Sequence, residues 1–143
     1  MAEIESQEPN AKVLFRVPSN DPDDDSADVE TLWAVSLEDH HYKLDNIPYF
    51  AYSVSDGDIV YAPFDPDEGF PTFHRVAKKS GNRTIRLIFE IPYEEGNETA
   101  AILDDLRELG ADFEGANKRY ICLNIPPASD FDAVAEYLIN NGV

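Results

Sequence analysis

The sequence is poor in basic side chains. It has 11 Lys and Arg residues against 29 Asp and Glu residues, which gives a formal net charge of −18. Proteins bind nucleic acid largely by displacing its counterions with Lys and Arg, and they bind anionic membranes through the same side chains. Neither nucleic acid nor a membrane surface is therefore expected as a direct partner. The charge favours a cationic protein instead.

Cysteine and long apolar runs are also scarce. The single cysteine, Cys122, excludes an intramolecular disulfide and any zinc site built from cysteine pairs. No stretch approaches the roughly 20 apolar residues of a membrane span, and the first residues lack the basic and apolar parts of a signal peptide. We therefore expect a cytoplasmic protein. Its 43% hydrophobic content predicts a compact fold rather than disorder.

Catalytic and cofactor motifs are missing as well. The seven glycines are scattered singly, so there is no phosphate-binding loop, and no serine lies in a G-x-S-x-G elbow. Cys122 lies in an alternating apolar pattern that does not stabilise a thiolate, which indicates a structural thiol. His40 and His41 would point to opposite faces of a strand, so we expect a polar turn there rather than a metal site. The sequence thus favours a protein that is not an enzyme and needs no cofactor.

An aspartate-rich segment at 19–28 is the first candidate for a metal. Asp21, Asp23 and Asp25 occupy positions one, three and five of a calcium-binding loop. Ser26 stands where the loop needs glycine, and Leu32 stands where it needs a bidentate glutamate. We therefore interpret this segment as a solvated acidic loop and expect no metal.

The first half of the chain shows the two-residue period of β-strands. Ser55-Asp56-Gly57-Asp58 has the residue types of a tight turn. We expect strands at 11–18, 30–37, 42–53 and 59–62, a longer connection at 63–71, and a hairpin that joins 74–78 to 83–91 through Ser80-Gly81-Asn82.

The second half changes to a helical period. Asn97 can cap a helix that ends near Gly110, a short strand is expected at 111–114 and another at 118–125, and Ser129 begins a capping box for a second helix. The fold class is therefore α+β: a small barrel-like, antiparallel β-rich half at 11–92, followed by a partial ferredoxin-like β-α-β-α half at 93–143, the two forming one compact unit. Residues 1–10 are expected to be disordered.

The basic residues are unevenly distributed. Five of them lie in the acid-free segment 75–86, so the rest of the chain carries −23. They are Arg75, Lys78, Lys79, Arg83 and Arg86. We interpret them as cations that pair with the surrounding acidic surface; the alternative is a basic ridge for an anionic partner.

Several segments taken together resemble a bacterial family known as domain of unknown function 4265. The similar segments are Val13-Leu14-Phe15-Arg16-Val17-Pro18, Glu30-Thr31-Leu32-Trp33-Ala34, 42–50, 54–60, 73–76, 80–86, 109–115 and Asn124-Ile125-Pro126-Pro127. The chain departs from the family pattern at Ala111, where a cysteine would be expected. The resemblance implies a bacterial context, in which some relatives accompany secreted toxins, but it implies no activity and no catalytic residues.

The leading hypothesis is a small acidic immunity protein that neutralises a cationic bacterial toxin domain by occluding its active site. An acidic surface would capture such a partner quickly, with a rate that falls as salt rises. The expected partner-binding residues are Asp23, Asp24, Asp25, Asp104, Asp105 and Glu108.

The alternative is a small-ligand-binding or enzymatic domain with a pocket between the two halves. Its polar lining would be Glu30, His74, Arg75 and Asn82, and Arg86 would complete the cluster if these residues converge. A scaffold or regulatory subunit is a third possibility.

Overall fold

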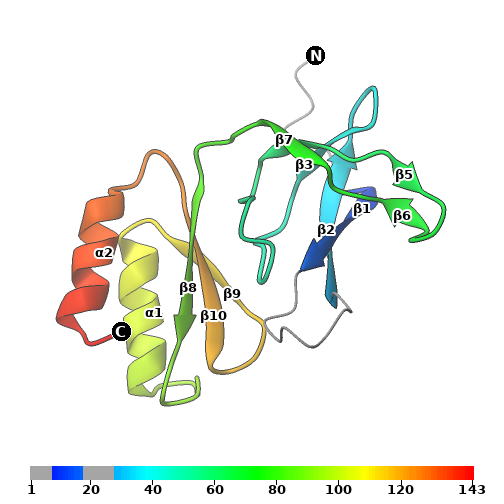
Figure 1. Ribbon diagram of the computed structural model, residues 1–143. Coiled ribbons are helices and arrows are strands. Elements are labelled where there is room, and N and C mark those ends of the chain that lie inside the picture. The colour runs from blue at the N-terminus through cyan, green and yellow to red at the C-terminus, as the bar shows by residue number, and fades with distance from the viewer. Residues whose placement is uncertain (1–7, 18–27) are drawn as a thin grey trace. The chain divides into compact units, whose positions relative to one another are not determined.

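The computed structural model describes residues 8–17 and 28–143 of the chain, which divides into two compact units at 1–80 and 81–143 (Figure 1). The predicted class, an α+β fold with a β-rich first half followed by β-α-β-α, is confirmed. The division falls between Ser80 and Gly81, so the strand at 83–88 groups with the second unit rather than with the expected lobe at 11–92.

Unit 1 contains an open, antiparallel five-stranded sheet rather than a closed barrel. The strands are β1 (Ala11–Val17), β2 (Asp28–Ser36), β3 (His41–Leu44), β4 (Ile59–Tyr61) and β7 (Arg75–Lys78), in the order β1-β2-β3-β4-β7. Residues 63–71, expected as a plain connection, include a second small sheet made of β5 (Phe64–Asp65) and β6 (Phe70–Pro71). The predicted strand at 42–53 is wrong beyond Leu44, where a long loop leads to β4.

One face of the five-stranded sheet carries the core of unit 1. Because successive side chains of a strand point to opposite faces, Val13, Leu32 and Val60 lie on the same face, and each is at most 2% exposed. Phe15 stacks on Phe73 in the same core, with ring centroids 4.8 Å apart. The other face of this sheet is called the second face below.

Unit 2 is a three-stranded sheet with two helices. Its elements are β8 (Arg83–Ile88), α1 (Glu98–Glu108), β9 (Asp112–Gly115), β10 (Tyr120–Ile125) and α2 (Phe131–Asn140), and the strand order is β8-β10-β9. Both helices lie on one side of this sheet (Figure 1). Leu103 and Leu106 of α1 and Val134 of α2 are buried against Leu123 of β10, which forms a second core.

The ends of the helices follow from local chemistry. Asn97 caps α1 as expected, because its side chain accepts a hydrogen bond from the Ala100 amide at 2.9 Å. The cap of α2 is Asp130 rather than Ser129. The Ser129 hydroxyl donates instead to the carbonyl of Gly110, 3.1 Å away, and Gly110 itself adopts a φ of 100° that favours glycine.

The predicted hairpin between 74–78 and 83–91 is wrong. β7 pairs with β4, whereas β8 pairs with β10, so the two strands belong to different sheets. Ser80-Gly81-Asn82 has the composition of a hairpin turn, and Gly81 has a φ of 92°, yet the chain uses it to pass from one unit to the next. Turn residues permit a reversal of the chain but do not decide which strands pair.

Of the ten N-terminal residues expected to be disordered, residues 1–7 lie outside the described residues. Asn10 is held to β2 by two hydrogen bonds: its amide donates to Ala34, and its side chain accepts from the Ser36 amide at 2.9 Å.

Candidate functional site

The residues of the expected polar cluster are divided between the two units. Asn82 and Arg86 belong to unit 2, while Glu30, His74 and Arg75 belong to unit 1. Within unit 1, Glu30 has the strand parity of the core face, whereas His74 and Arg75 both contact the ring of Tyr61.

The Glu30 carboxylate organises a loop rather than lining a pocket. It accepts hydrogen bonds from three consecutive backbone amides: Tyr49 at 2.7 Å, Phe50 at 3.1 Å and Ala51 at 2.9 Å. Glu30 is only 9% exposed, so these bonds replace the water that the charge has lost. The side chain of Asn46 accepts from the Trp33 amide at 2.8 Å and fixes the start of the same loop.

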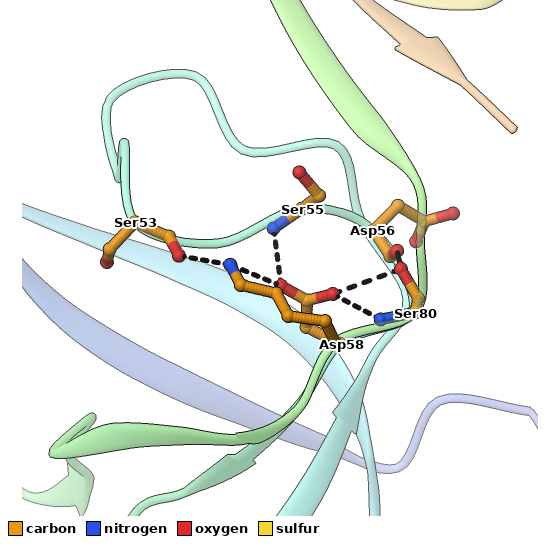
Figure 2. Close-up of polar contacts among 6 residues, drawn as sticks. Ser53, Ser55, Asp56, Asp58 and Ser80 are labelled. Atoms are coloured by element: carbon orange, nitrogen blue, oxygen red, sulfur yellow. Dashed lines mark hydrogen bonds and ion pairs between the residues drawn. The ribbon is translucent and has the colours of Figure 1, made fainter. Parts of the chain in front are cut away.

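Asp58 is the centre of a second buried network that the sequence did not reveal (Figure 2). Its fully buried carboxylate accepts from the amides of Ser55, at 3.0 Å, and Ser80, at 2.8 Å. Lys79 Nζ lies 3.3 Å from Asp58 Oδ2 and donates to the carbonyl of Ser53 at 2.8 Å. The Asp-Gly turn was the visible signal, because Asp58 closes that turn with a bond to Ser55 O. Both carboxylates thus bind backbone amides and serve the fold.

Tyr61 is the centre of an aromatic and basic cluster on the second face. All three histidines of the chain contact its ring: His40 at 6.3 Å, His41 at 5.4 Å and His74 at 5.8 Å between ring centroids. The Arg75 guanidinium lies 4.2 Å from the centre of the same ring, which is a cation–π contact. No sequence motif indicated this cluster, because its members come from a turn and three strands.

The turn between β2 and β3 holds two of these histidines in place. Asp39 and His40 have φ angles of 56° and 63°, a left-handed conformation that is uncommon for residues other than glycine. Two such residues in succession make the two-residue hairpin turn that normally takes Asn-Gly. His41 Nδ1 lies 2.9 Å from the carbonyl of Asp39, which fixes the orientation of that ring. The expected polar turn at 40–41 is therefore present.

Two of the remaining cations of segment 75–86 also have contacts of their own. The Arg83 guanidinium lies 4.5 Å from the ring centre of Phe131, and Lys79 belongs to the Asp58 network. Lys78 is exposed on β7, and Arg86 is half-buried on β8. Within unit 1, the cations Arg75 and Lys79 of this segment belong to different groups, the Tyr61 cluster and the Asp58 network.

The expected acidic residues of the helix are solvent-exposed. Asp104, Asp105 and Glu108 all lie in the second half of α1. Asp105 Oδ2 accepts a hydrogen bond from the Tyr137 hydroxyl at 2.6 Å. Desolvation, together with this bond and the negative charge of Asp105, raises the pKa of Tyr137 to about 12. The other expected partner residues, Asp23, Asp24 and Asp25, lie outside the described residues.

Unit 2 also contains an open hollow of 260 Å³ near the C-terminus. Ile88, Ile91 and Ile102 give it an apolar lining, and Glu90 and Glu98 add carboxylates to its wall. Ile88 is 78% exposed, which is unusual for a large aliphatic side chain. Sequence reasoning missed this hollow because its walls come from β8, α1 and the chain end.

The described residues contain neither a cluster of metal ligands nor a membrane-spanning helix. In residues 8–17 and 28–143, no three His, Cys, Asp or Glu side chains are grouped so that they could hold a metal ion. Neither described helix is long and apolar enough to cross a membrane. Cys122 is fully buried in β10.

The fold is similar to that of a solved protein. A structure titled "Novel crystal structure of a hypothetical protein from Neisseria gonorrhoeae" matches with a TM-score of 0.73 and 20% sequence identity, over 94% of this chain and 89% of that one. At this identity the match establishes the fold alone. A search of curated proteins found no match.

The sequence comparison is more specific. The model of the family described as "Domain of unknown function (DUF4265)" matches residues 30–142. This range contains most of the segments in which the resemblance was seen, while the strand at 11–17 precedes it. The chain therefore belongs to the DUF4265 family.

Proposed function

We propose that this protein is an immunity protein whose acidic second unit captures and occludes a cationic bacterial toxin domain. The observation that supports this proposal is that three exposed carboxylates lie close together on α1. They belong to Asp104, Asp105 and Glu108. All twelve carboxylates of residues 81–143 are exposed, so the surface of this unit is negative without any buried acid. Such a surface accelerates encounter with a cationic protein.

The position of the α1 carboxylates disfavours a purely structural role. They lie toward the C-terminal end of the helix, where the helix dipole is negative and acidic side chains are unfavourable. Asp104 and Glu108 are also four residues apart, a spacing at which like charges destabilise a helix by about 0.2–0.5 kcal/mol. Arg107 is the basic residue in the last turn. An arrangement that costs the helix stability supports a role in binding.

The hollow beside Ile88 is suited to bind a basic side chain of the partner. Its isoleucines can contact the aliphatic stem of an Arg or Lys side chain, while Glu90 or Glu98 meets the charged end. Buried arginines are frequent hot spots of protein interfaces. Toxin capture would then combine charge steering at α1 with anchoring at the hollow.

The test partner is the C-terminal domain of a secreted protein, sought among the products of the genes that neighbour the gene of this chain. Association is measured by stopped flow, and protection by growth of cells that express the domain. We expect D104K/E108K to slow association at least about tenfold at low salt, with a smaller effect as screening increases. The matched control is D132K/E136K on α2, which has the same charge change and spacing. Ile88→Asp should raise the dissociation rate more than it lowers the association rate.

Melting temperatures of all variants establish that each is folded. If D104K/E108K associates at the rate of the unmodified chain, and salt does not change that rate, α1 has no steering role. If the unmodified chain neither binds the toxin domain nor protects the growth of cells that express it, the proposed immunity function is wrong.

A further inference from the structure

The second face of the five-stranded sheet has a charge opposite to that of the protein. Outside the register irregularity between Ile59 and Val60, beyond which Lys78 pairs with Ile59, strand parity places four charged side chains on this face, and every one of them is basic. They are Lys12, Arg16, Lys43 and Arg75. With 29 acidic residues against 11 basic ones in the chain, so complete a separation shows that the fold sorts charge between the two faces of one sheet.

Three of these four cations are available to a ligand. Arg16 is engaged by Asp65 and Glu68, at 3.4 and 3.1 Å. In the described part of the chain, Lys12, Lys43 and Arg75 make no ion pair with a carboxylate. Arg75 is exposed, and the two lysines are half-buried.

Two aromatic rings lie among these cations. Trp33 is 45% exposed, and Lys12 Nζ lies 4.7 Å from the centre of its ring. Tyr61 is covered by Arg75 and bordered by the three histidines. The ideal strand spacing puts the two rings about 16 Å apart, so they can take separate groups of one extended ligand.

We propose that the second face binds single-stranded nucleic acid. Bases stack on Trp33 and on the Tyr61–Arg75 pair, and phosphates contact the three available cations. Lysine and arginine side chains are long enough to move away from the ring that they cover and to contact a neighbouring phosphate. A base can also stack on the plane of a guanidinium group. A sheet face with an exposed Trp33, a half-buried Tyr61 under Arg75 and further cations suits an extended strand, whose bases are unpaired. This inference goes beyond the proposed capture of a toxin and uses a different unit.

The net charge of −18 does not exclude this ligand. Salt screens exposed charges over about 8 Å at physiological ionic strength, so a ligand on one face responds mainly to that face. Carboxylates still border it, with Glu38 and Asp39 in the β2–β3 turn and Asp45 after β3. Binding is therefore expected to be readily measured at low salt and weak at high salt.

The rings favour nucleic acid over an acidic peptide. An Asp- or Glu-rich segment would use the cations but would gain little from Trp33 and Tyr61, whereas every nucleobase has a face that stacks on them. The two ligands are therefore expected to have different effects on the fluorescence emission of Trp33.

Trp33 is the only tryptophan, so its fluorescence reports this face directly. The full chain is titrated with a short oligothymidylate, and Trp33 emission is read together with the anisotropy of a labelled copy. We expect quenching that saturates. With three phosphate contacts, the association constant should fall about 100-fold for a tenfold rise in salt.

Four variants locate the site. Arg75→Glu and Lys43→Glu should each weaken binding at least tenfold. Lys118→Glu, which changes the net charge equally in unit 2, should change it less than threefold. Arg75→Gln, which introduces no negative charge, should weaken binding without altering the melting temperature more than Lys118→Glu does.

Absence of quenching at low salt would overturn the proposal, and so would binding that Arg75→Gln and Lys43→Glu leave intact. An oligoglutamate that competes as well as the oligothymidylate would assign the face to acidic proteins instead. Toxin capture is read out separately through D104K/E108K, so either proposal can fail alone.

Discussion

Glu30 accepts hydrogen bonds from three consecutive amides, so its charge holds the loop at 49–51 to β2. In Glu30→Gln one oxygen becomes an NH₂ group, which cannot accept from an amide. We expect a loss of about 2 kcal/mol in the free energy of unfolding, because a buried donor is left unpaired. Urea denaturation measures it. Glu38→Gln, at an exposed turn, should change stability by less than about 0.5 kcal/mol. Equal effects would refute this role of Glu30.

Tyr137 provides a pH test of the bond between α2 and α1. Its pKa is about 12 in the folded chain and 10 in the unfolded chain, so the unfolded chain releases the phenolic proton first. The stabilising contribution is therefore complete below pH 10 and is lost as the pH rises toward 12. Tyr137→Phe should reduce stability by about 1 kcal/mol at neutral pH, and the gap to the unmodified chain should shrink above pH 10.

The measurement compares urea denaturation of the two proteins at several pH values, with tyrosinate absorbance recorded in parallel. Asp105→Asn removes the negative charge beside the phenol, so it should bring the late tyrosine titration closer to the others. A gap that stays constant through alkaline pH would contradict the assignment.

At the scale of elements, the β2–β3 turn combines a strained backbone with two ring contacts. Asp39 and His40 occupy positions at which Asn and Gly are preferred. Asp39→Asn with His40→Gly should therefore stabilise unit 1 by about 1 kcal/mol. The same change removes one ring from the Tyr61 cluster and should weaken oligothymidylate binding. Thermal melting and Trp33 titration measure the two effects; a destabilised variant would show that the histidine ring contributes more than the strain costs.

At the scale of the whole molecule, the net charge of −18 opposes the compact state through self-repulsion. The Lys118–Glu94 ion pair is largely exposed and the Arg16–Glu68 pair is partly exposed, so each contributes little to the free energy of unfolding. We expect the melting temperature to rise by several degrees as NaCl increases from about 10 mM to about 300 mM, because salt screens the repulsion. Uncharged sucrose serves as a control for general solvent effects. A melting temperature that falls with NaCl would mean that attractive pairs dominate.

Much of the secondary structure followed from local patterns. The apolar spacing and Asn97 placed α1 correctly, and the alternation around Leu32 placed β2. Strand pairing did not follow, since the predicted hairpin across Ser80-Gly81-Asn82 joins strands of different sheets. Local sequence records whether a segment can form a strand, whereas its neighbour in the sheet depends on which distant apolar faces are buried together.

The predicted sites fared unevenly for the same reason. The exposed acids of α1 could be read from helical periodicity, because three turns of one helix fix which residues share a face. Glu30 and Asp58 could not be assigned, because their partners are backbone amides 3 to 22 residues away. The Tyr61 cluster needs a turn and three strands to meet, and no spacing along the chain encodes that meeting.

The acidity of this protein, its single cysteine within an apolar strand pattern, its α+β class and its family could all be inferred from the amino-acid sequence alone. The tertiary structure decided where charge is presented. Its strands alternate between core and surface, so the cations of distant segments meet on one face of a sheet, while the carboxylates of unit 2 all remain exposed. The net charge adds up all charged residues without regard to their positions. A binding partner contacts only one face of the protein, and strand pairing decides which charges lie on that face.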